Sequence, residues 1–333
     1  MEEWPYLLML FGSTLCFAGQ FVAMKYYQRS ATQGLFQTFF FSFLTGALIF
    51  LIFGVISLSQ GFVWNTTSFL YATLVGVLSF STQIVGLLAM RFGNISIYTL
   101  FTMLGSMALP FFFGVFYYHE QPSLYRIIGS VLMVMSLFLP VFDHLSKSKE
   151  GSNKKREFWF FFLCFIQFGL NGAVSIFSSL HSRLPKSISS LAFTSFSNLI
   201  IFVLSAVGML FIAIADKKEK QNTQCSLGFF PFLMTLLWAG FNGSGNALSM
   251  EAVKHLDASL NYPVISGGVI VLTCFLGKIL FKEKNGIFTY IGVGLTLIAR
   301  ELQEVCVIRK PHSLPSVTFR IPSPLFPPRS IRA

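Results

Sequence analysis

Polar side chains recur at helical spacing inside two long apolar segments of this chain. In each segment the polar positions are four and then three residues apart, which places them on one face of an α-helix. The two stripes consist of Ser79, Gln83 and Gly86, and of Asn242, Asn246 and Ser249. Amides and hydroxyls act by donating and accepting hydrogen bonds. The stripes therefore predict either the walls of a polar cavity or contacts that hold neighbouring helices together.

Other polar side chains could face the same cavity. Gln20, Gln167 and Asn171 lie near the middle of two more apolar segments, and Asn198 in a further segment is interpreted as structural. Hydrogen bonding between helices is the alternative for each of them. We predict a substrate-binding set made of Gln20, Gln83, Tyr98, Asn171, Asn242, Asn246 and Asn261.

Proline and glycine mark places where a helix could break or pack closely. Pro263 lies near the start of one apolar segment, Gly267 and Gly268 lie near its middle, and Gly105 is the counterpart of Gly268 in another segment. Broken helices in membrane proteins expose main-chain groups to a cavity. Small residues equally permit a close helix crossing. Both interpretations stay open for these four residues.

Two glutamates, Glu120 and Glu283, end two apolar segments beside basic residues. The simplest interpretation is a solvated anchor at the membrane surface, and a gating role is the alternative. No Asp or Glu lies near the middle of any apolar segment. Proton-coupled antiporters usually carry a carboxylate within the membrane. Facilitated diffusion and coupling through a peripheral acid therefore both stay open.

The sequence contains no signature of enzyme chemistry. We find no Ser/His/Asp constellation within the apolar segments, no HExxH motif and no P-loop, and the five cysteines lack metal-ligand spacing. We therefore predict no catalytic residue, no metal and no cofactor, and we do not expect an enzyme.

The elements that position the polar residues are apolar segments of membrane-spanning length. Charged residues make up only 11% of the chain, against about a quarter in soluble proteins. A span needs about 20 apolar residues, so we predict an all-α polytopic membrane protein with ten transmembrane helices. The ten segments are residues 5–27, 35–58, 68–90, 94–117, 123–142, 158–180, 189–214, 228–251, 258–281 and 286–303.

An internal repeat organises these segments. Residues 69–140 align without a gap to residues 232–303, which are 163 positions later, and Ser, Gly and Glu stay in register. Each half contains five segments, and because five is odd, equivalent helices must enter the membrane from opposite sides. The pattern predicts two inverted five-helix repeats.

The repeat divides the chain into parts. We expect a first repeat at 1–142, a polar basic linker at 143–157, a second repeat at 158–305 and a Pro-rich disordered tail at 306–333. The formal charge of +11 resides in loops and tail. There it sets topology and does not indicate nucleic acid binding. The loop charges place the linker in the cytoplasm, whereas the basic tail favours the opposite orientation.

The chain resembles the drug/metabolite transporter superfamily, in its EamA-like branch. The first copy of the pattern is Gly93-Asn94-Ile95-Ser96, Leu104-Gly105, Pro110, Gly114, Glu120 and Gly129. The second copy is Leu256-Asp257-Ala258-Ser259, Pro263, Gly267-Gly268, Gly277, Glu283 and Gly292. The resemblance implies a substrate site between the halves, alternating access and cytoplasmic termini. It also implies substrates such as amino acids, nucleotide sugars, purines, other metabolites or cationic drugs.

The expected function is transport of a small polar metabolite, for which uncharged amides suit a neutral or zwitterionic solute. One alternative is multidrug efflux through an aromatic cavity, given 41 Phe residues. Another is a non-transporting membrane scaffold or sensor. The expected partners are a small-molecule substrate and the lipid bilayer, with the chain a monomer or homodimer. By default we expect a multi-pass protein of the cell membrane, specifically a bacterial inner membrane.

Overall fold

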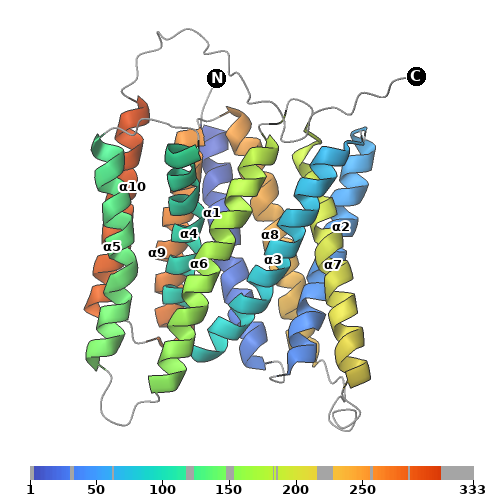
Figure 1. Ribbon diagram of the computed structural model, residues 1–333, viewed down its shortest axis with the longest axis horizontal. Helices are drawn as coiled ribbons and strands as arrows, with labels where there is room; N and C mark the ends of the chain where they lie inside the picture. The colour runs from blue at the N-terminus through green and yellow to red at the C-terminus, as the bar shows by residue number, and fades with distance from the viewer. Residues whose placement is uncertain are drawn as a thin grey trace, which may run out of the picture.

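The computed structural model is a bundle of α-helices that run alternately down and up (Figure 1). It describes residues 4–30, 34–61, 64–117, 124–147, 154–182, 184, 187–215, 228–255, 258–283 and 286–308. No β-strand occurs in these ranges.

Ten helices make up the described part of the chain. They are α1 (Trp4–Ser30), α2 (Leu35–Ser59), α3 (Thr66–Phe92), α4 (Ile95–Tyr117), α5 (Leu124–Lys147), α6 (Lys154–Ser182), α7 (Ser190–Ala215), α8 (Phe229–His255), α9 (Ala258–Phe281) and α10 (Ile287–Ile308).

Each apolar segment expected from the sequence corresponds to one of these helices. Six of them, α1, α2, α3, α4, α6 and α7, are long and apolar enough to cross a membrane. Spanning by the other four helices stays a prediction. The helices also extend beyond the apolar runs. α5 ends at Lys147 and α6 begins at Lys154, and both residues lie within the linker expected at 143–157. Lys and Glu are good helix formers, so an apolar helix continues readily into such residues.

The helices pack in pairs across the two halves of the chain. The most extensive contacts join α1 to α8, α2 to α7 and α5 to α10. α6 packs against both α3 and α4, and α1 also packs against α9. The α5–α10 pair lies at one edge of the bundle in Figure 1. The interior that remains is bounded mainly by α1, α3, α4, α6, α8 and α9.

Glycines permit the closest of these contacts. A Cβ added to Gly105 in α4 would collide with the main-chain carbonyl of Phe168 in α6. A Cβ added to Gly46 in α2 would lie 2.9 Å from the main-chain nitrogen of Phe202 in α7. Main chain cannot move aside as a flexible side chain can. Gly105 therefore serves close packing of α4 on α6, one of the two roles its sequence allows.

We predict that Gly105→Ala destabilises the bundle. The added methyl group forces α4 and α6 apart, and overpacking of this kind costs about 1–3 kcal/mol. Thermal unfolding of the purified protein in detergent should show a lower Tm. Gly294→Ala is the matched control, because no atom lies within 4 Å of a Cβ at that position in α10. Equal Tm values for the two variants would contradict this prediction.

Candidate functional site

The helix ends define two ends of the bundle. The lower end in Figure 1 holds the last residues of α1, α3 and α9 and the first residues of α4 and α6. The upper end holds the opposite termini of the same helices. Heights within the bundle are given below relative to these two ends.

The polar stripe of α8 faces α1. The Nδ2 of Asn242 donates a hydrogen bond of 2.8 Å to the Oε1 of Gln20. The Nδ2 of Asn246 donates to the main-chain oxygen of Asn242 at 2.8 Å and to its Oδ1 at 3.3 Å. Three residues of the predicted binding set therefore form one connected amide network between α1 and α8.

A second amide group lies between α6 and α4. The Nδ2 of Asn171 donates to the main-chain oxygen of Thr102 at 2.7 Å. Nearby elements contribute two buried glutamines, Gln83 in α3 and Gln167 in α6, which are 7% and 2% exposed. The Oε1 atoms of both have no hydrogen-bond partner. A buried unpaired acceptor costs about 1–3 kcal/mol, so both oxygens are available to a donor.

The helix register places Gln20 and Gln83 at a common height. α1 and α3 both run downward and touch where a Cβ on Gly86 would lie 2.9 Å from the Cε of Met24. Gln20 precedes Met24 by four residues and Gln83 precedes Gly86 by three. Both glutamines therefore lie about one helical turn above this contact, roughly 5 Å toward the upper end.

We call the five residues that lie in or beside these networks the polar layer. They are Gln20, Gln83, Asn171, Asn242 and Asn246.

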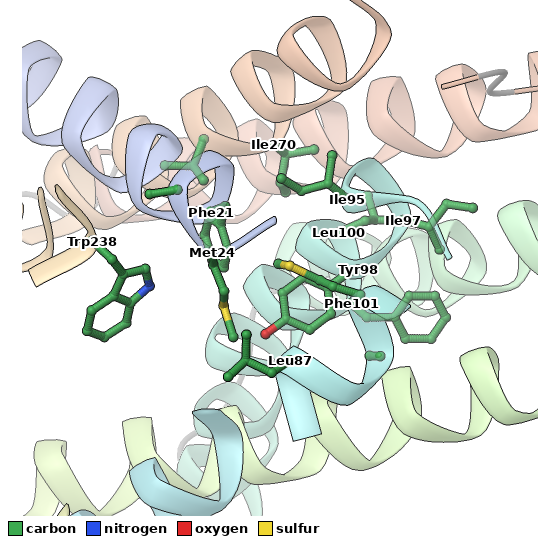
Figure 2. Packing of buried hydrophobic residues seen from close by; sticks show 14 of the residues in the cluster. Phe21, Met24, Leu87, Ile95, Ile97, Tyr98, Leu100, Phe101, Trp238 and Ile270 are labelled. Atoms are coloured by element: carbon green, nitrogen blue, oxygen red, sulfur yellow. The ribbon is translucent and has the colours of Figure 1, made fainter. Parts of the chain in front are cut away.

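An apolar floor lies below the polar layer. It consists of Phe21, Met24 and Tyr98, which lie close together in Figure 2, and of Gly86, where an added Cβ would meet the Tyr98 hydroxyl and the Met24 Cε. The rings of Phe21 and Tyr98 are 6.0 Å apart in an edge-to-face arrangement. Tyr98 was expected in the binding set, and the structure places its buried ring in this floor.

Two buried charges lie at the lower end, below the floor. The Nζ of Lys25 in α1 donates to the main-chain oxygens of Met90 and Gly93, at 2.7 and 2.5 Å. The carboxylate of Glu283 accepts from the main-chain nitrogens of Ile95 and Ser96 at 2.7 and 3.4 Å, and from the Oγ of Ser96 at 3.0 Å.

These charges complement the helix ends that they contact. α3 ends and α4 begins at one corner, residues 90–96, which we call the α3–α4 corner. A cation stabilises the carbonyls at a helix C-terminus, and an anion stabilises the N–H groups at an N-terminus. Lys25 is 4% exposed and Glu283 is 8% exposed. Glu283 is thus not a freely solvated anchor, which was the simpler interpretation of its sequence.

Sequence reasoning missed Lys25, because it was counted only among the charges that set topology. The available signal was its place five residues before the end of α1, inside the helix. Glu120, the second expected gating residue, lies outside the described residues, as do the side chains of Asn261 and Pro263.

The glycine pair of α9 lies in a continuous helix. A Cβ on Gly268 would come within 2.5 Å of the Cγ2 of Thr14 in α1, which is a close packing contact. Gly267 and Gly268 also form one wall of a mostly apolar groove between α1, α9 and α10. Within the described ranges, no three His, Cys, Asp or Glu side chains come together as metal ligands would.

Comparison with known proteins finds a family match in the first part of the chain. Residues 4–142 match the model of the EamA-like transporter family. No curated protein matches the chain. Solved structures do, and one described only as "Crystal structure of protein" covers 92% of this chain and 98% of its own. With a TM-score of 0.55 and 13% identity, that likeness shows a shared fold through both halves of the chain.

We predict that Gln20 and Asn242 are energetically coupled. Replacing either one by Leu leaves the other without its hydrogen bond, so a second replacement should cost less than the first. A coupling of about 0.6 kcal/mol is typical of such bonds between membrane helices. A double-mutant cycle from unfolding in detergent measures it, and strictly additive effects would show that the two amides act independently.

Proposed function

We propose that this multi-pass membrane protein carries a small polar solute by alternating access, because residues 4–142 match the model of the EamA-like transporter family. The polar layer is the proposed binding site. The observation that carries this proposal is a set of amides enclosed within an apolar bundle. The buried Oε1 of Gln83 in this layer has no hydrogen-bond partner, and neither has the Oε1 of Gln167 in α6, one turn before Asn171. Such atoms are costly unless they bind something.

The helix packing supports two inverted repeats. In two equivalent halves, each helix of the first half corresponds to the helix five places later in the second. The α1–α8 contact then corresponds to α6–α3, and the α1–α9 contact corresponds to α6–α4. All four contacts are present. The same correspondence maps α2–α7 and α5–α10 onto themselves. A pseudo-two-fold axis in the membrane plane relates such halves, and a solute site near that axis is typical of transporters.

The chemistry of the polar layer favours an uncharged or zwitterionic solute. Its side chains are amides, and none of its five members is charged. The two unpaired glutamine oxygens suit a solute that offers N–H or O–H groups. Multidrug efflux would need exposed aromatic side chains inside the bundle. The most exposed phenylalanines, such as Phe116 and Phe211, instead lie on its outer surface.

Uptake into proteoliposomes tests the proposal. A labelled panel of neutral and zwitterionic metabolites and of cationic drugs is offered with and without a pH gradient. We expect saturable uptake of one metabolite class that persists without the gradient. Broad uptake of the drugs would favour the efflux alternative, and uptake of nothing from the panel would contradict transport of these solutes.

We predict that Gln83→Leu and Asn246→Leu each reduce uptake about tenfold. Leu keeps the size of the side chain and removes a hydrogen bond worth about 1.4 kcal/mol in binding. The measurement is initial uptake rate against solute concentration. Asn198→Leu is the matched control, since the Nδ2 of Asn198 donates within its own helix, to the Thr194 oxygen. Unchanged transport in both test variants would contradict the proposal that the polar layer is the binding site.

A further inference from the structure

We propose that the Glu283 carboxylate is the moving latch of a gate at the lower end, which leaves the start of α4 each time that end opens. The inference rests on the proposed function. It adds which end of the bundle is closed in this structure and which residues hold that end closed. In this state the lower end is closed.

The latch joins the two halves of the chain. A helix N-terminus is usually capped by the residue just before it, whereas Glu283 caps α4 from 187 and 188 positions away. A local cap stays with its helix during any movement of the bundle. A cap from the other half is broken whenever the halves move apart, so this contact reports on their separation.

The backbone ties the latch to α9. The main-chain nitrogen of Glu283 donates to the Gly277 oxygen at 3.2 Å. Lys282 between them has a φ of 52°, in the left-handed region that turns the chain back beside the helix end. Because the Glu283 main chain is held by α9, its carboxylate follows that helix. A displacement of α9 away from α4 must therefore withdraw the latch.

A second contact closes the same end. Lys25 binds the carbonyls on the other side of the α3–α4 corner, and its charge is attracted to that of Glu283. Two further cations lie nearby: the guanidinium of Arg29 lies 4.7 Å from the centre of the Phe281 ring, and Arg156 of α6 donates to the Arg91 oxygen of the same corner at 3.0 Å. Side chains from α1 and α6 and the latch that follows α9 thus hold the corner together.

α1 packs against the same corner. It contacts α3 and α4, and Met24, Lys25 and Phe21 make these contacts. The lower end is therefore closed by side chains of α1 as well as by the latch.

A disulfide across the gate provides the first test. A Cβ on Gly277 would lie 2.7 Å from the Oγ of Ser96, so Ser96→Cys and Gly277→Cys bring two thiol-bearing side chains into direct contact across the gate. The pair is placed in a background without the five native cysteines. We expect oxidation to reduce uptake at least tenfold and reduction to restore it. Uptake that is equal before and after complete cross-linking would show a permanent staple and overturn the proposal.

The matched control joins two other helices. Gly54→Cys with Ser195→Cys links α2 to α7, where a Cβ on Gly54 would lie 3.1 Å from the Oγ of Ser195. These helices pack extensively and lie away from the α3–α4 corner. We expect uptake to survive this cross-link. Uptake by the reduced protein, without any cross-link, is measured first. If this protein moves no solute, the result contradicts the proposed transport function and does not bear on the proposed latch.

The second test needs no transport. A cysteine at Leu87, a buried position of α3 between the polar layer and the lower end, is labelled with a water-soluble maleimide in detergent. We expect Glu283→Ala to raise the labelling rate at least tenfold, because the unlatched end opens. Glu157→Gln removes the same charge from the start of α6 and should leave the rate unchanged. Ser205→Cys, buried in α7, should stay unlabelled and thereby exclude global unfolding. An unchanged rate in Glu283→Ala would overturn the proposal.

Discussion

The first N–H groups of a helix have no partner within that helix, and a bundle surrounded by lipid cannot leave them buried and unpaired. At the start of α4 the partners come from Glu283, a residue of the other half of the chain. The preceding helix, α3, ends three residues earlier, and its exposed carbonyls are paired by Lys25. Meeting these two requirements brings α1, α3, α4 and α9 together at the lower end and fixes their relative heights.

The layers above the lower end follow from those heights. Once Lys25 reaches the end of α3, Met24 and Phe21 in the preceding turn of α1 lie beside Gly86 and Tyr98, where only a small residue leaves room for the tyrosine side chain. About one turn above Met24 and Gly86 lie Gln20, which accepts from Asn242, and Gln83, whose Oε1 has no partner. Charge, apolar floor and polar layer therefore follow one another along α1.

The sequence was sufficient to predict the ten helices, because runs of apolar residues between polar loops define their bounds directly. Spacing also predicted that Asn242 and Asn246 share a face, and they do join one network. It could not predict the role of Lys25, since a cation near a helix end has the same sequence pattern whether it is solvated or pairs with carbonyls 65 positions away. Tyr98 illustrates a similar limit. The sequence predicted it in the substrate-binding set, whereas its contacts depend on Gly86 in another helix.

The position of the charges also bears on how such a gate could work. A carboxylate and an ammonium group separated in the middle of a bilayer would each lose their partner where no water can replace it, at a cost of several kcal/mol. At the lower end, water can reach both charges and the helix-end groups that they leave. Among the residues whose burial the structure describes, Glu283 is the only buried acid and Lys25 the only buried lysine, and both lie there. A latch of this kind can open and close without a mid-membrane carboxylate, because hydration at the surface replaces the contacts that each opening breaks.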